Sequence, residues 1–258
     1  MPELPEVEYV RRRLQPAMAG ARFVRVTTRR PDLRYPFPKD FARVLEGQRV
    51  RAVLRRAKYL LVELESGDRL LMHLGMSGSF QVASRMPRDL DKHDHVLFEM
   101  SSGKTVIFND PRRFGFMTLV EDDEFAVLGP EPLDRAFTAD VLSAALARRN
   151  TPIKAALLDQ RVVAGLGNIY VVEALHRAGL SPKRKAATIK GTAAEALALS
   201  IKETIRDAIR HGHRPDGPDR FLVYDREGRS CPRRGCGGVV RRIVQAGRST
   251  FFCPLCQR

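Results

Sequence analysis

The stretch Leu128-Gly129-Pro130-Glu131-Pro132-Leu133 divides the chain into two parts that have different hydrophobic patterns. Between residues 22 and 120, short runs rich in Val, Leu and Phe are separated by turn residues such as Ser66-Gly67-Asp68, which is typical of antiparallel strands. After residue 133, apolar residues recur with the 3.6-residue period of helices. We therefore expect an α+β protein with an N-terminal antiparallel β-sandwich, flanking helices and a C-terminal helical domain.

These patterns predict three segments: a β-sandwich domain over residues 1–130, a helical domain over 131–220, and a short β-hairpin region over 221–258. A helix is expected to start near Pro5, with Val7, Val10 and Leu14 on one face. Strands are predicted over residues 23–28, 59–64, 70–74, 96–100, 105–108 and 116–120. Further helices are predicted over residues 139–149, 152–159, 168–178 and 192–210.

The charge of the chain favours a nucleic-acid partner. The 258 residues carry a formal net charge of +15 and have a pI near 10.3. Such a field attracts polyanions, and nucleic acid is the commonest polyanion that a soluble basic protein meets. The alternative is a charged surface that serves solubility alone. Binding to an acidic membrane is less favoured, because the sequence has no basic amphipathic helix with a continuous apolar face.

The chain start does not resemble a signal peptide, because it has two acids and two prolines instead of a basic and then apolar run. No apolar stretch approaches the roughly 20 residues that a membrane-spanning helix needs. We therefore expect a cytoplasmic protein, nucleoid-associated if the source is a bacterium.

Four cysteines with metal-binding spacing lie in the last 28 residues: Cys231, Cys236, Cys253 and Cys256. Two close pairs of thiolates can each supply half of a tetrahedral zinc site. All four are expected to be ligands, so the single Zn²⁺ would be structural. The runs Val239-Val240 and Thr250-Phe251-Phe252 are expected to be the strands of a hairpin. Free or disulfide-bonded cysteines are the alternative.

The opening Met1-Pro2-Glu3-Leu4-Pro5-Glu6-Val7-Glu8 carries a candidate nucleophile. Removal of Met1 would expose Pro2 as an α-amine, and an α-amine has a pKa of about 7.7–8.0 against about 10.4 for Lys. Its free base can attack a sugar C1′, while the adjacent Glu3 carboxyl donates a proton to the sugar. The alternative is that these residues only cap and start a helix.

Motifs along the whole chain resemble bacterial formamidopyrimidine-DNA glycosylase. They are the opening octet, Arg56-Ala57-Lys58-Tyr59-Leu60-Leu61, His73-Leu74-Gly75-Met76-Ser77-Gly78, Lys92-His93-Asp94-His95-Val96, Asn109-Asp110-Pro111-Arg112-Arg113-Phe114-Gly115, Gly165-Leu166-Gly167-Asn168-Ile169-Tyr170 and the four cysteines. The resemblance implies a bifunctional glycosylase and abasic-site lyase that acts on double-stranded DNA. In this family Pro2 would be the nucleophile and Glu3 the proton donor. Glu6 would arrange the sugar and Lys58 would contact a phosphate and assist the chemistry.

The resemblance also implies DNA-contacting residues. Met76, Arg112 and Phe114 match the positions that fill the vacated base stack and face the orphaned base, although Met76 and Phe114 taken alone would be assigned to the core. His93 is expected to have a structural or sugar–phosphate role. Residues 153–179 resemble the helix–two-turn–helix of the family. Lys154 and Asn168 in that stretch, and Arg248 in the hairpin, are expected near the DNA backbone, with Asn168 also capping a helix.

Residues 213–220 form a shorter segment than members that act on 8-oxoguanine usually have there, and they lack a Gly-Tyr-Phe segment. This departure places 8-oxoguanine activity in doubt and leaves ring-opened purines, oxidised pyrimidines and abasic sites as candidates. The alternatives are therefore an abasic-site lyase or oxidised-pyrimidine glycosylase and, from a different class, a non-catalytic DNA-binding protein. A monomer is expected.

Overall fold

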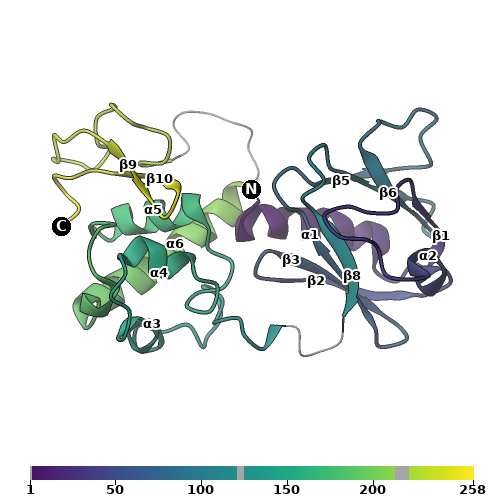
Figure 1. Ribbon diagram of the computed structural model, residues 1–258, viewed down its shortest axis with the longest axis horizontal. Helices are drawn as coiled ribbons and strands as arrows, with labels where there is room; N and C mark the ends of the chain where they lie inside the picture. Colours follow the sequence, from purple (N-terminus) through teal and green to yellow (C-terminus); the bar gives the residue numbers. More distant parts are fainter. Residues whose placement is uncertain (1, 121–124, 213–220) are drawn as a thin grey trace. The chain divides into compact units, whose positions relative to one another are not determined.

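The computed structural model describes residues 2–120, 125–212 and 221–258, and the chain folds as two compact units, residues 1–126 and 127–258 (Figure 1). The division lies close to the boundary predicted at residue 130. The further boundary at residue 220 adjoins the segment 213–220, which lies outside the described residues, so it stays a prediction.

The first unit contains two antiparallel four-stranded sheets. One has the order β1-β6-β7-β5 and the other β2-β3-β4-β8. Its elements are α1 (Leu4–Met18), β1 (Phe23–Thr28), α2 (Phe41–Leu45), β2 (Val50–Arg56), β3 (Tyr59–Leu64), β4 (Arg69–His73), β5 (Ser79–Ala83), β6 (Asp94–Met100), β7 (Thr105–Asn109) and β8 (Phe116–Val120). The predicted β-sandwich is confirmed.

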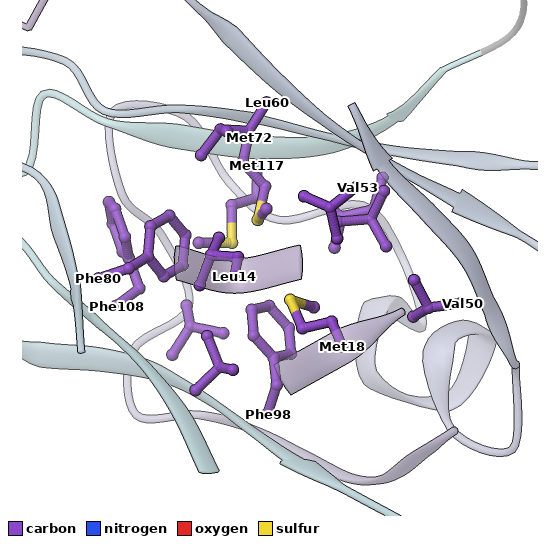
Figure 2. Close-up of a cluster of buried hydrophobic side chains, with 14 of the residues drawn as sticks. Leu14, Met18, Val50, Val53, Leu60, Met72, Phe80, Phe98, Phe108 and Met117 are labelled. Carbon is purple, nitrogen blue, oxygen red and sulfur yellow. The ribbon is translucent and has the colours of Figure 1, made fainter. Parts of the chain in front are cut away.

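The core of this unit combines side chains from both sheets and α1. Figure 2 shows Leu14 of α1 among Leu60 and Met72 of one sheet and Phe98 and Phe108 of the other, and all five are less than 2% exposed. Burial of these apolar groups is the main force that holds the unit together. On α1, Val7 and Leu14 are buried as predicted, whereas Val10 is only half-buried.

Two strands and one short helix of this unit were absent from the predicted pattern. Strand β2 has the sequence VRAVLRR, in which only Val50 and Val53 are buried. Its arginines hide the apolar alternation that marks a strand. Strand β5 has one fully buried residue, Phe80, and α2 spans five residues, too few for a helical period to appear.

The second unit is helical and ends in a hairpin. It contains α3 (Ala139–Leu146), α4 (Ile153–Leu158), α5 (Asn168–Arg177), the short 3₁₀ helix η2 (Ala186–Thr188), α6 (Thr192–His211), β9 (Arg241–Gln245) and β10 (Arg248–Phe252). Helix α6 packs against α5 and α3, and α5 also contacts β10. A cluster of Val172, Val223, Val240 and Phe251 joins α5 to the hairpin. The predicted helices are present.

The predicted first strand of the hairpin was wrong in position. The strand that pairs with β10 begins at Arg241, whereas Val239 pairs with Ser230. The buried Val240 belongs to the cluster with α5, and its N–H donates to the Arg229 carbonyl. The apolar character of Val240 therefore reflects packing on the helix instead of the β9–β10 ladder, whereas the Val239 side chain is exposed.

Within the described ranges, none of the helices combines the length and the apolar character needed to cross a membrane.

Candidate active site, nucleic-acid interface and metal centre

The start of α1 fixes the candidate nucleophile and acid. Glu3 is 2% exposed and is the N-cap of α1, while Pro2 just before it is half-buried. The Glu3 N–H donates to Glu6 Oε2 at 3.0 Å, and the two glutamates form a capping box. Capping and catalysis are compatible at this position, because the capping box holds Glu3, and with it the adjacent Pro2, in one place.

Glu8 attaches α1 to strand β2. Its carboxylate accepts hydrogen bonds from Arg11 and Arg12 on α1 at 2.9 Å and from Arg55 Nε on β2 at 3.2 Å. Burial alone would raise the pKa of Glu8, but the hydrogen bonds from Arg11 and Arg12 and the charge of Arg55 outweigh it and lower the pKa. The chain start is thereby held to the hairpin that carries Lys58, a contact that spacing along the sequence did not reveal.

Lys58 lies at the two-residue turn between β2 and β3 and is 8% exposed. Its neighbour Ala57 has φ of +53°, a backbone conformation that non-glycine residues rarely adopt. Across the sheet Tyr59 pairs with His73. Burial first, and then the charges of Lys58 and Arg34, lower the pKa of His73 to about 4, so this imidazole is neutral at physiological pH.

Met76 and Phe114 are exposed, at 44% and 40%, and do not belong to the core. Both line a surface pocket of about 530 Å³ together with Arg112, whose guanidinium lies 4.6 Å from the centre of the Phe114 ring. Gly75 has φ of +61°, and a Cβ there would lie 2.2 Å from the Phe114 carbonyl carbon. The two loops therefore require glycine at this contact, and together they present the three predicted side chains on one surface.

Asp110 locks these two loops, and sequence reasoning assigned it no role. Its Oδ1 accepts from Ser77 Oγ at 2.5 Å and its Oδ2 from the Gly115 N–H at 2.8 Å. Its carbonyl lies 3.0 Å from His95 Nε2. Asp110 is fully buried, so it stabilises the loop conformation without facing a ligand.

His93 and Arg113 lie beside this region. The His93 ring lies 6.2 Å from that of His95, and the backbone N–H of His93 donates to Asp91 Oδ1 at 2.7 Å. Arg113 contacts Asp32 at 3.6 Å and also lines the pocket. Each is partly accessible to a phosphate, and within residues 2–120, 125–212 and 221–258 neither belongs to a group of side chains that could hold a metal ion.

In the second unit, Lys154, Asn168 and Arg248 come together from three separate stretches. Lys154 is fully buried, and its Nζ has no hydrogen-bond partner among the described residues. Burial and the charge of Arg248 lower the pKa of Lys154 to about 8. Asn168 Nδ2 donates to the carbonyl of Ser249, next to Arg248, at 3.0 Å. Lys154 and Arg248 are therefore close enough for their charges to interact, and the neutral Asn168 amide is bonded to the residue next to Arg248.

The predicted capping role of Asn168 was wrong. The N-cap of α5 is Gly167, in extended conformation, and Asn168 is the first helical residue. Its side-chain amide instead reaches Ser249 of the hairpin, because strand β10 packs against α5. Gln160 shapes the preceding loop: its Oε1 accepts from the Gly165 N–H at 2.8 Å, and its Nε2 donates to the Leu166 carbonyl at 2.9 Å.

The four cysteines form one compact cluster of sulfur atoms. Their sulfur atoms all lie within 4.8 Å of one another, with Cys231–Cys256 at 3.8 Å and Cys236–Cys253 at 3.6 Å. These separations fit the edge of about 3.8 Å expected for a zinc tetrathiolate with bonds of about 2.3 Å, and they are too long for disulfides. A Cβ on Gly238 would lie 2.7 Å from Cys253 Sγ. The cluster is therefore a closed structural zinc site.

Comparison with known proteins covers the whole chain. Three family descriptions match: the formamidopyrimidine-DNA glycosylase N-terminal domain over residues 1–117, the H2TH domain of the same family over 128–215, and the zinc finger found in FPG and IleRS over 230–258. Formamidopyrimidine-DNA glycosylases from Rhodopseudomonas palustris (strain BisA53) and Beijerinckia indica are 56% and 52% identical to it, with full coverage of both chains in each case.

Solved structures agree with this result. The Lactococcus lactis formamidopyrimidine-DNA glycosylase bound to DNA containing an abasic site has a TM-score of 0.91 and 33% identity, with full coverage of both chains. A MutM protein in complex with DNA containing carbocyclic 8-oxoguanine has the same TM-score, identity and coverage.

Proposed function

Because the chain belongs to the formamidopyrimidine-DNA glycosylase family, we propose that it excises damaged bases from DNA and cleaves the abasic site that results, as a bifunctional enzyme of base-excision repair. The family assignment covers both units and the zinc finger. The observation that carries the catalytic assignment is the chain start, where the buried Glu3 caps α1 directly after the half-buried Pro2.

In the proposed mechanism, Pro2 is the nucleophile after removal of Met1, which lies outside the described residues. Its ring nitrogen attacks C1′ of the deoxyribose, the bond from C1′ to the damaged base breaks, and the base leaves with the proton of the proline nitrogen. The bond from C1′ to the ring oxygen O4′ then opens, which leaves an iminium between the Pro2 nitrogen and C1′. Glu3 donates the proton that the released O4′ takes up, and Glu6 orients the sugar. The iminium then acidifies the C2′ proton, so that β- and δ-elimination cut the strand on both sides of the lesion.

Lys58 is proposed to hold a phosphate beside this centre. Its position in a tight turn, and the attachment of that hairpin to α1 through Glu8 and Arg55, support a fixed relation between the ammonium and the chain start. Burial of Lys58 at 8% exposure means that few rotamers remain to be ordered on binding.

Met76, Arg112 and Phe114 are proposed to replace the base that is flipped out of the duplex. Their shared exposure supports this role, because an exposed thioether and ring can enter the base stack at little cost to the protein core. Arg112 can present paired donors to the estranged base. On the second unit, Lys154, Asn168 and Arg248 are proposed to contact the DNA backbone, with His93 doing so on the first.

The choice of damaged base depends on a smaller part of the chain than the reaction does. The short segment 213–220, on which the doubt about 8-oxoguanine depends, lies outside the described residues. We propose that ring-opened purines, oxidised pyrimidines and abasic sites are handled in preference to 8-oxoguanine. We further propose a monomer that acts in the bacterial cytoplasm on nucleoid DNA, in line with the bacterial origin of the relatives.

Borohydride trapping on a duplex with one abasic site tests the catalytic assignment. The wild-type protein should form a covalent adduct, whereas Pro2→Gly should form little or none. Glu3→Gln should still trap on a preformed abasic site but lose base release. If the wild-type protein forms no adduct, the catalytic assignment is wrong and a non-catalytic DNA-binding protein is the remaining interpretation. If Pro2→Gly still traps strongly, another amine is the nucleophile.

Base release from matched duplexes containing formamidopyrimidine, 8-oxoguanine or an oxidised pyrimidine tests the lesion assignment. We expect 8-oxoguanine to be released most slowly. Equal rates for 8-oxoguanine and formamidopyrimidine would show that the short segment does not limit recognition. Release of none of the three, with trapping retained, would identify a pure abasic-site lyase.

A further inference from the structure

His176 lies against the cysteine cluster at the last turn of α5. It is 2% exposed, and its Nε2 lies 3.3 Å from Cys231 Sγ and 3.8 Å from Cys256 Sγ. Its other ring nitrogen, Nδ1, is buried and has no hydrogen-bond partner in the described parts of the chain. With no acceptor at Nδ1, the ring proton is best placed on Nε2, where it faces sulfur.

The histidine lies beside the metal site and is not one of its ligands. Among the described residues, the candidate ligand atoms that all lie within 4.8 Å of one another are the four sulfurs. Four thiolates around one Zn²⁺ leave an excess of negative charge on the sulfurs, and a neighbouring N–H donor reduces that charge.

We propose that His176 is a positioning residue of the zinc centre, which donates its Nε2–H to the Cys231 thiolate, fixes that sulfur for metal binding and slows the loss of zinc. The donor comes from the helical part of the unit, so the metal site is completed by a residue 55 positions away from Cys231 in the chain. The proposal concerns retention of the metal and does not depend on the catalytic roles assigned to Pro2 and Glu3.

The contacts around His176 support this role. Arg233, between the first two cysteines, donates to the His176 carbonyl and, at 3.2 Å, to the Arg177 carbonyl. After the last cysteine, Gln257 Nε2 donates to the Leu180 carbonyl at 2.9 Å. Both halves of the zinc site are therefore attached to the end of α5, which holds the imidazole at a constant place.

The start of the same helix is attached to the hairpin through Asn168 and Ser249. Helix α5 is thus linked at both ends to the zinc-binding region. It follows that loss of zinc should disturb the position of Asn168 as well as the knuckles that carry the cysteines.

Two substitutions distinguish the effect of the N–H donor from the effect of the ring's shape. His176→Phe keeps a planar ring and removes the donor, whereas His176→Gln keeps an N–H near the position of Nε2. We expect His176→Phe to bind zinc roughly 10- to 100-fold more weakly and His176→Gln to stay within about threefold of the wild type. His211→Phe, at an exposed histidine of α6, is the control and should not change zinc affinity.

Zinc transfer from the full-length protein to a chromogenic chelator measures this affinity, and far-UV circular dichroism of the zinc-loaded variants checks that each is folded. With Co²⁺ in place of zinc, the thiolate-to-metal absorption should shift in His176→Phe and be restored in His176→Gln. If His176→Phe is folded and binds zinc as tightly as the wild type, the proposal is wrong. It is also wrong if both variants fold and lose zinc equally. If His176→Phe fails to fold, the proposal depends on the Gln variant, and a Gln variant that loses zinc readily would overturn it.

Discussion

Substitution of Lys154 by Met should stabilise the protein while it weakens DNA binding. The Lys154 ammonium is fully buried, and its Nζ has no hydrogen-bond partner among the described residues. Burial, and then the charge of Arg248, lower its pKa from 10.5 to about 8. Met has a similar length and no charge, so it removes the cost of burying an unpaired cation.

The pKa of Lys154 sets the size of the expected gain in folding stability. Each pKa unit corresponds to about 1.4 kcal/mol, so a pKa of about 8 sets an upper bound of about 3 kcal/mol on the destabilisation that Lys154 causes at neutral pH. Below pH 8 the ammonium is charged in both folded and unfolded chains, and the full penalty is present. Between pH 8 and pH 10.5 the folded protein loses this proton first, so the penalty shrinks, and above that range it is absent.

Urea unfolding followed by far-UV circular dichroism, with zinc in excess, measures the effect at pH 7 and again near pH 10. Lys154→Met should be more stable than the wild type at pH 7, with a smaller difference at the higher pH. Lys190→Met, at an exposed lysine of the same unit, should change stability little. In the same samples, Lys154→Met should bind an abasic-analogue duplex less tightly. A Lys154→Met protein that is no more stable at pH 7 would refute the reasoning.

Three further results are expected. Affinity for an abasic-analogue duplex should fall with salt, with a slope of log K against log salt near −4 to −5 for about four to six neutralised phosphates, and a slope near zero would contradict the charge argument. Gly238→Ala should lose zinc because its Cβ would lie 2.7 Å from Cys253 Sγ, while Val239→Ala, at the next residue, whose side chain is 47% exposed, should retain it, as metal analysis can show. His73 has its pKa lowered from 6.5 to about 4, so stability should decline as pH falls through that window, and His73→Gln should flatten the decline in acid-unfolding curves.

Local sequence determined the elements whose pattern lies within one segment. The helical period over residues 192–210 and the short apolar runs at 23–28 and 59–64 predicted α6, β1 and β3, because such patterns depend on neighbours a few residues apart. The spacing of Cys253 and Cys256 indicated a metal in the same way. Motifs distributed along the chain identified the family, and through it the proposed roles of Pro2, Glu3 and Lys58.

Only the tertiary structure decided which side chains are exposed and which distant groups meet. Met76 and Phe114 have apolar side chains that local sequence assigns to the core, yet the contact between Gly75 and the backbone of Phe114 leaves them at the surface. Asp110 locks that surface, and His176 reaches Cys231 across 55 residues. Burial and hydrogen bonding of this kind depend on how separate segments pack, and no short-range pattern in the sequence records them.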